Sequence, residues 1–352
     1  AINKNADLLR ASIASASNDY RLGANEAPPA IISTFIGDYL HNLLNEIEEN
    51  VKDGKMSPED KTELKLNIGK IPQIMLDNTD RNRTSPFAFT GNKFEFRAVG
   101  STANCAHPMA VLNTIMAKQL KDFKIAVDER IEKGDGKDEA IFKELQKQIR
   151  ESKRVRFEGN GYGEEWRIEA EGRGLSNHKD TPRALKVLGE KWVSDLFEEM
   201  EVMSAREVHA RQEIEFEKYV MKVQIESRIM NEISQNHILP VVIDYQNKLL
   251  ANIENLISIF GEAKGKEMAA TSIKIVNKVS EHLNQLIQLN AEMLEARKVA
   301  NKLEDIEAKA EAYCDDVKAY FDDIRYHADK LELLVDDELW PLPKYREILF
   351  TK

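Results

Sequence analysis

The sequence predicts a helix-rich α+β fold followed by an extended all-helical region. Between Lys191 and Leu339, glycine and proline occur only at Gly261, Gly265 and Pro240, and both residues interrupt helices. Apolar residues in that stretch recur at steps of three and four, which is the helical period. The first 190 residues hold most of the glycines and one short segment that alternates apolar with charged residues, as a strand does.

The first expected element after the N-terminal segment is a helix that begins at Pro28-Pro29, because proline is well tolerated in the first helical turn. Its apolar face would carry Ile32, Phe35, Tyr39, Leu43 and Ile47. A polar stretch between Lys52 and Lys65 would end it. We therefore expect a helical insert over about residues 29–80.

The segment from Lys93 to Arg97 alternates and is predicted to be a strand. Phe94 and Phe96 would lie on one face, and Lys93, Glu95 and Arg97 on the other. Three charges on one face suit a site for phosphates, a metal and a carboxylate. They also suit a strand with one face in water, and the pattern alone favours that interpretation.

The remaining elements of the first half follow from proline, glycine and helical spacing. Pro108 predicts a helix that carries Leu112, Ile115, Met116, Leu120 and Phe123. A loop at 133–137 would lead to a short amphipathic helix with Ile141, Leu145 and Ile149. The glycines of 159–163 lack the ending of a P-loop and predict a tight turn before a helix near Glu164.

Two long helices are predicted in the second half. The first carries Val242, Tyr245, Leu249, Ile253, Leu256 and Phe260, and Gly261 stands where a left-handed cap is expected. The second carries Ile275, Val279, His282, Leu286, Leu289, Met293, Ala296, Ala300 and Leu303. Strict steps of three and four form the narrow seam of a bundle or hairpin. We expect this region, 191–352, to serve assembly or regulation rather than chemistry.

Composition limits the classes of function. The chain has 352 residues, a net charge of −11 and a pI near 5.4, which opposes nucleic-acid binding. Its two cysteines, Cys105 and Cys314, lie far apart and outside any metal-ligand spacing. No apolar run is long enough to span a membrane. These features predict a cytoplasmic protein of about two units, without a membrane or nucleic-acid partner.

Two further segments concentrate candidate site residues. Arg21 and Glu26 lie on glycine-containing backbone ahead of the predicted helix, where active-site residues are often found. Arg81 and Arg83 supply two guanidinium groups suited to phosphate or carboxylate. A surface connection and solvated arginines are the alternative interpretations, and the pattern alone favours them.

Three segments taken together resemble glutamine synthetases. Asn18–Pro28 (NDYRLGANEAP) resembles their glutamate flap, Asp80–Ser85 (DRNRTS) their arginine loop, and Gly91–Pro108 their metal-bearing strand and following helix. The insert between Pro29 and Asp80, the FEFRAVG wording at 94–100 and the closing VDDELWPLP at 335–343 resemble the bacterial type III enzymes. The order of the segments matches as well.

The resemblance implies ATP-dependent ligation of glutamate and ammonia through a γ-glutamyl phosphate, with Mg²⁺ or Mn²⁺. Arg83 would stabilise the transferring phosphate, as arginines do in phosphoryl transfer. Glu26 would sit on the flap that excludes water and helps to deprotonate ammonium. The family assembles as homo-oligomers of stacked hexameric rings with sites between neighbouring subunits.

The same resemblance assigns the binding residues. Glu95 would be a metal ligand, because carboxylates suit Mg²⁺ and Mn²⁺. Arg21 and Arg97 would hold the substrate glutamate, and Lys93 would lie near the nucleotide together with Arg83. One departure is Ala88, which stands where family members commonly carry a second arginine.

We therefore predict that residues 1–190 are the C-terminal portion of a glutamine synthetase catalytic domain and 191–352 a helical bundle or hairpin. The family's other metal ligands would lie upstream of Ala1, so we expect the 352 residues alone to be inactive. The alternative is a helical scaffold or partner-binding protein that keeps a degenerate enzyme remnant. The long seam favours that alternative, and the intact charged segments oppose it.

Overall fold

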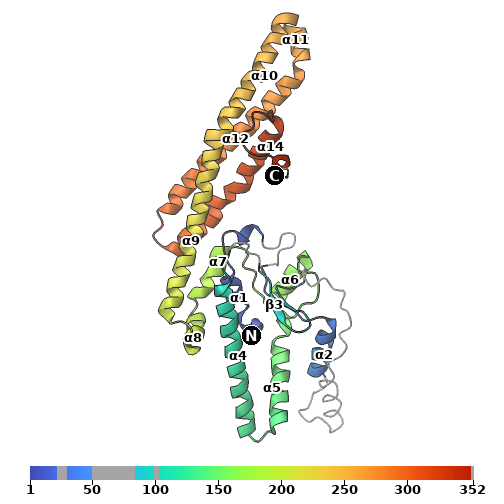
Figure 1. The fold of residues 1–352 in the computed structure, drawn as a ribbon, viewed down its shortest axis with the longest axis vertical. Helices are drawn as coiled ribbons and strands as arrows, with labels where there is room; N and C mark the ends of the chain where they lie inside the picture. The colour runs from blue at the N-terminus through green and yellow to red at the C-terminus, as the bar shows by residue number, and fades with distance from the viewer. Residues whose placement is uncertain (22–29, 50–83, 99–102, 350–352) are drawn as a thin grey trace. The chain divides into compact units, whose positions relative to one another are not determined.

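A computed structural model describes residues 1–21, 30–49, 84–98 and 103–349 of the chain. The contacts divide it into two compact units, Ala1–Glu215 and Phe216–Lys352, each described here by itself. Both units are built mainly of helices, as predicted (Figure 1). The assignment of 1–190 to a catalytic portion and 191–352 to an extension stays a prediction. None of the described helices is long and apolar enough to cross a membrane.

The first unit holds most of the shorter elements. Its helices are α1 (Ile2–Ser12), α2 (Asp38–Glu49), α4 (Ala106–Glu132), α5 (Lys137–Glu151), α6 (Glu164–Gly172), α7 (Thr181–Leu185), α8 (Lys191–Glu199) and the start of α9 (Ala205–Glu232). Its 3-10 turns are η1 (Asn18–Tyr20), η3 (Lys153–Val155) and η4 (Lys186–Gly189).

A small three-stranded sheet lies in this unit, in the order β1 (Thr34–Phe35), β2 (Phe87–Phe89), β3 (Phe94–Phe96). β1 pairs with β2 in parallel, and β2 pairs with β3 antiparallel, with Ala88 opposite Glu95. The strand predicted from the alternation at 93–97 is confirmed. Phe87 stacks on Phe94 with ring centroids 5.1 Å apart, so the aromatic face predicted for this strand is packed against its neighbour.

The helix predicted from Pro28-Pro29 through Ile47 is wrong in its first part. Residues 30–37 are not helical, and Phe35 lies in β1. Ile32 and Phe35 are only 3% and 4% exposed, because this segment lies inside the unit. The carbonyl of Thr34 accepts a hydrogen bond from Phe157 N at 3.0 Å. Gly37, with φ of 84°, ends this segment, and α2 follows at Asp38. The rest of the predicted insert, 50–80, lies outside the described residues.

The long α4 and the shorter α5 form a hairpin, and the predicted loop at 133–137 joins them. Gly134 has φ of 104°, a conformation that favours glycine. The fully buried residues of α5 are Ala140 and Glu144, whereas Leu145, which we placed on the apolar face, is 44% exposed. The helix prediction is therefore confirmed, but helical spacing did not identify its most buried position.

An aromatic cluster forms a core of the first unit beside the sheet. Phe157 stacks on Trp166 with ring centroids 3.7 Å apart, and the guanidinium of Arg173 covers the Trp166 ring at 5.4 Å. Ile31, Val155, Ala170 and Leu175 complete this core. The turn predicted at 159–163 is confirmed and leads into α6.

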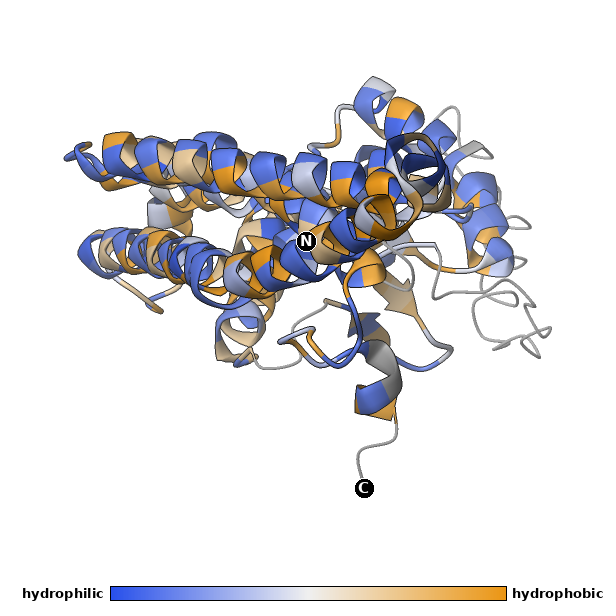
Figure 2. Cartoon of the chain, turned by 90° about the horizontal axis from the view of Figure 1, so that it is seen from above, coloured by the Kyte–Doolittle hydropathy of each residue, from blue (hydrophilic) through white to orange (hydrophobic). Residues whose placement is uncertain are grey.

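The second unit contains long helices, with polar and apolar residues alternating around them (Figure 2). After the remainder of α9 it contains π segments at Ile233–Ile238 and Tyr313–Val317, a 3-10 turn at Lys318–Tyr320, and the helices α10 (Leu239–Phe260), α11 (Glu262–Met268), α12 (Ala270–Asn301), α13 (Ile306–Ala312), α14 (Phe321–Leu334) and α15 (Tyr345–Leu349).

Only part of the predicted seam of α12 is buried: Ile275, His282, Leu289 and Ala296 are half-buried, and Leu303 is 37% exposed. Val279, Leu286, Met293 and Ala300 are each at most 1% exposed, one heptad apart. α12 packs against α10 and α14, and the chain turns between α10 and α11 at Gly261, which has φ of 78°. α10 and α12 thus pack against each other, while the assignment of 191–352 to a bundle or hairpin extension stays a prediction. The contact of α12 with α14 was not anticipated.

Candidate functional site

The charged face of β3 brings three predicted site residues together. The carboxylate of Glu95 lies 3.3 Å from Lys93 Nζ through Oε1 and 3.2 Å from Arg97 Nη2 through Oε2. All three side chains lie on one face because successive residues of a strand point to opposite faces. The backbone of Arg97 is held to the sheet edge, since its N–H donates to Pro86 O at 2.7 Å.

These contacts set the electrostatics of the face. The hydrogen bond from Arg97, and then that from Lys93, lower the pKa of Glu95, so its carboxylate stays ionised well into the acidic range. The side chains of Lys93, Glu95 and Arg97 are 65%, 35% and 23% exposed. A ligand can therefore reach an ionised carboxylate that has a cation on either side.

Ala88 lies directly opposite Glu95 in the β2–β3 register, and residues paired in this way share one face of a sheet. Ala88 is completely buried. The position where the resemblance led us to expect a second arginine is thus beside Glu95, and this chain presents only a methyl group there. Among the residues that the structure describes, the cations paired with Glu95 are Lys93 and Arg97, which flank β3.

Of the other predicted site residues, the structure describes only Arg21. Arg21 follows η1, where its N–H donates to Asn18 O at 3.0 Å, and its side chain is exposed. Glu26 and Arg83 lie outside the described residues. Their assigned roles, like those of Lys93, Glu95 and Arg97, stay predictions.

The donor chemistry of Glu95 fits Mg²⁺ or Mn²⁺, which prefer carboxylate oxygens. Across residues 1–21, 30–49, 84–98 and 103–349, no group of three or more His, Cys, Asp or Glu side chains is arranged to hold a metal ion. Glu95 would thus be one ligand within a larger set. Cys105 and Cys314, both in the described part of the chain, form no disulfide.

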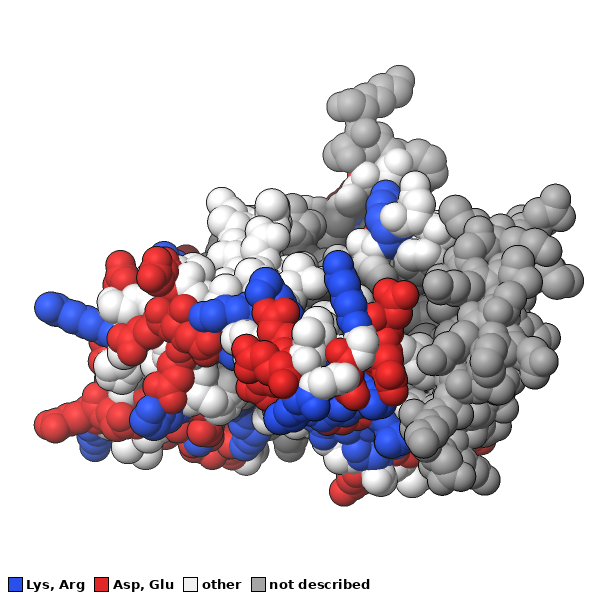
Figure 3. Space-filling model, turned by 90° about the horizontal axis from the view of Figure 1, so that it is seen from below, with Lys and Arg blue, Asp and Glu red and all other residues white. Residues whose placement is uncertain are grey.

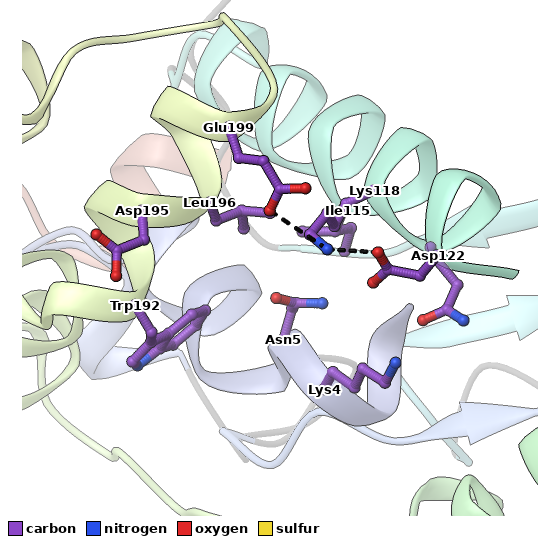
Figure 4. Close-up of a pocket in the computed structure, with 10 residues that line it drawn as sticks. Lys4, Asn5, Ile115, Lys118, Asp122, Trp192, Asp195, Leu196 and Glu199 are labelled. Atoms are coloured by element: carbon purple, nitrogen blue, oxygen red, sulfur yellow. Dashed lines mark hydrogen bonds and ion pairs between the residues drawn. The ribbon is translucent and has the colours of Figure 1, made fainter. Parts of the chain in front are cut away.

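A pocket of about 280 Å³ lies between α1, α4 and α8, and sequence patterns did not reveal it (Figure 4). Lys118 Nζ lies 2.5 Å from Asp122 Oδ1 and 3.3 Å from Glu199 Oε2, and Trp192 lines another side. Asp122 and then Glu199 raise the pKa of Lys118. Its residues come from helices far apart in sequence, so no local spacing signals it. The charged side chains of Lys118, Asp122 and Glu199 in this pocket pair with one another.

Charge on the surface drawn in Figure 3 is mixed, with acidic and basic side chains interspersed. Several ion pairs of the described residues are one helical turn apart, such as Lys124 with Asp128 at 2.5 Å and Lys191 with Asp195 at 2.7 Å. Exposed pairs of this kind contribute at most about 1 kcal/mol each. They are solvated helix faces and provide no second candidate site.

Residues 140–256 match the family described as Glutamine synthetase C-terminal domain. The whole chain is 51% identical over 351 residues to a Glutamine synthetase of Bacteroides fragilis (strain YCH46) and covers 48% of that protein. The chain belongs to the glutamine synthetase family. It is also 36% identical over 352 residues to a Type-3 glutamine synthetase of Dictyostelium discoideum, of which it covers 47%.

A Glutamine synthetase of Butyrivibrio fibrisolvens is 33% identical over 359 residues and is covered to 49%. The chain therefore spans about half the length of the curated glutamine synthetases it matches. The resemblance inferred from the flap, arginine-loop and β3 segments is confirmed at the level of the family. The matches extend through the helical second unit, so the long helices are part of the glutamine synthetase relationship.

Proposed function

We propose that this chain takes part in the ATP-dependent ligation of glutamate and ammonia to glutamine, as part of a longer polypeptide. The observation that carries the proposal is the charged face of β3, where an ionised carboxylate lies between Lys93 and Arg97. Phosphoryl transfer to a carboxylate depends on positioning and on cations placed at the transferring oxygens. A carboxylate for a divalent cation and a guanidinium for a substrate carboxylate are the groups that this chemistry needs.

In this proposal Glu95 is one ligand of Mg²⁺ or Mn²⁺, which neutralises charge on the phosphates when bound. Arg97 and Arg21 hold the glutamate carboxylates, because guanidinium groups bind carboxylates in a bidentate manner. Lys93 lies by the nucleotide. The hydrogen bonds from Arg97 and Lys93 lower the pKa of Glu95 and so favour the carboxylate form, which is the form that binds a metal ion.

Two further residues complete the proposed reaction. Arg83 stabilises the transferring phosphoryl group, and Glu26 closes over the γ-glutamyl phosphate, excludes water and assists the deprotonation of ammonium. Both assignments rest on the family motifs that surround these residues in the sequence. The protein acts in the cytoplasm as a homo-oligomer, in which the second unit serves assembly or regulation, and the 352 residues alone are inactive.

The test is Glu95→Gln in a polypeptide of the length of the curated relatives that contains this chain. The substitution removes the charge and keeps the shape, so we expect ADP release that depends on glutamate and ammonium to fall by at least about 100-fold. Glu164→Gln is a matched control, because Glu164 also pairs with an arginine, Arg167, at 2.9 Å. Normal turnover in a folded Glu95→Gln variant would overturn the assignment.

The proposed role of the helical region has its own experiment. The residues after 190 are deleted from the same polypeptide, and subunit number and turnover are both measured. We expect the oligomer to be lost or reduced in size, because the deletion removes α8 to α15, including the buried positions of α12. Unchanged assembly together with unchanged kinetics would contradict this role.

A further inference from the structure

The buried guanidinium of Arg10 is an unusual feature of the first unit. Arg10 lies on α1 and is only 1% exposed. Its Nε donates to His178 O at 2.9 Å, whereas Nη1 and Nη2 are buried without a hydrogen-bond partner in the part of the chain that the structure describes. Burying a charged group with incomplete pairing costs several kcal/mol of folding free energy. We therefore asked what the buried guanidinium of Arg10 holds in place.

The charge of Arg10 is retained. Burial lowers its pKa to about 10, and the carboxylates of Asp19 and Asp180 oppose that shift. The guanidinium is therefore protonated at neutral pH, near two carboxylates that belong to different elements, η1 and the start of α7.

α1 holds the chain before α7 through two residues one helical turn apart, Asp7 and Arg10. Ser176 Oγ donates to Asp7 Oδ2 at 3.2 Å, and His178 Nε2 lies 3.8 Å from Asp7 Oδ1. Together with the bond from Arg10 to His178 O, these contacts tie residues 176–178 to one face of α1.

The residues that follow 176–178 contact η1 directly. Asp180 caps α7 by accepting from Arg183 N at 3.0 Å. The next residue, Thr181, is 1% exposed and its hydroxyl donates to Asp19 Oδ1 at 2.7 Å. Asp19 is the central residue of η1, and η1 ends in the bond from Arg21 N to Asn18 O. A continuous path of contacts thus runs from Arg10 to the backbone of Arg21.

We propose that Arg10 is a positioning residue: through His178, Thr181 and Asp19 it fixes the turn that presents Arg21. The inference rests on the proposed function for the role of Arg21 toward glutamate, whereas the path of contacts stands without it. A rigid turn at this point lowers the entropy lost when an exposed arginine engages a carboxylate, because the backbone is already ordered.

The first experiment measures amide hydrogen exchange in the 352-residue chain and needs no activity. In Arg10→Met we expect the amides of Asn18 and Arg21 to exchange at least about tenfold faster, while those of α4 keep their protection. Arg10→Lys, which keeps the charge but has fewer donors, should show an intermediate rate. Thr181→Val, which cuts the same path at a second point, should accelerate the same two amides.

Arg156→Met is the matched control, because Arg156 is also a buried arginine of the first unit, 4% exposed and 3.9 Å from Glu48. It should leave the exchange of Asn18 and Arg21 unchanged. Unchanged exchange at these amides in folded Arg10→Met, or in Thr181→Val if the methionine variant fails to fold, overturns the proposal. Acceleration spread equally over α4 overturns it too, since that describes general destabilisation.

The second experiment measures kinetics in the longer polypeptide. Arg10→Lys should raise the KM for glutamate by about tenfold and leave kcat within about twofold, because positioning acts on binding of the carboxylate. A tenfold loss in kcat with no change in the KM for glutamate would overturn the link to Arg21. If Glu95→Gln proves fully active, the proposed function fails, and hydrogen exchange still decides whether Arg10 orders the turn.

Discussion

The side chains of Glu95, on β3, and Arg97, which directly follows β3, form an ion pair with Nη2 3.2 Å from Oε2 on the charged face of the sheet. The antiparallel neighbour β2 contributes buried Ala88 opposite Glu95. Within the described residues, the cations that lower the pKa of this carboxylate are Arg97 and then Lys93, its neighbours along the chain.

Removal of Arg97 should raise the pKa of Glu95. The hydrogen bond from Arg97 is the main cause of the lowered pKa and that from Lys93 the second, so Arg97→Met should raise it more than Lys93→Met. Titration of the Glu95 carboxyl carbon by NMR measures both shifts. Equal pKa values in the parent chain and in Arg97→Met would contradict the ion pair.

Trp166→Ala should destabilise the first unit by about 3–5 kcal/mol, the usual cost of removing a large buried aromatic residue. Trp166 is 1% exposed and stacks on Phe157. Denaturation in urea followed by circular dichroism measures the loss. Trp192→Ala is the control, because Trp192 is 39% exposed and should cost much less. Similar costs for the two tryptophans would argue against the aromatic core.

Glu144→Ala should cost more stability than Leu145→Ala, its neighbour on α5. The Glu144 side chain is 2% exposed, and its Oε2 lies 3.3 Å from Arg130 Nε. Gln148 Nε2 donates to Glu144 Oε1 at 2.8 Å and would lose that acceptor. We expect a cost of about 1–3 kcal/mol for Glu144→Ala and less for exposed Leu145, measured by thermal unfolding. The reverse order would show that helical spacing had identified the buried face correctly.

The second unit should lose stability as the pH falls below about 6.5, the unperturbed pKa of histidine. His327 Nδ1 lies 3.0 Å from His282 Nδ1, and burial, then His282, lower the pKa of His327, while Asp323 and Glu281 oppose the shift. The unfolded chain therefore binds more protons between the two pKa values, so stability is lost as the pH falls through the folded pKa.

Thermal unfolding between pH 7.5 and about 5 checks this expectation. His327→Gln should flatten the pH dependence, because the pair then carries one titratable ring. His237→Gln is a suitable control, since His237 lies in the same unit and is exposed. An undiminished slope in His327→Gln would exclude the histidine pair as its source.

The local features of this protein were readable in the sequence. Apolar residues at steps of three and four predicted α10 and α12, because one face of a helix must be apolar to pack. Gly261 was predicted to end α10, and it lies directly after that helix. Alternation placed Lys93, Glu95 and Arg97 together, because side chains of a strand alternate between faces. The motif order in the first half also predicted the family that the comparisons show.

Only the tertiary structure decided which local patterns are buried. Phe35 has helical spacing with Tyr39 but lies in β1, because β1 pairs with β2, about fifty residues further along the chain. Arg10 and Glu144 are buried charges that no periodicity marks, since Arg10 bonds to His178 and Glu144 pairs with Arg130 on another helix. Local hydrogen bonding and periodicity determine which elements form, whereas burial depends on the surfaces that distant segments bring against them.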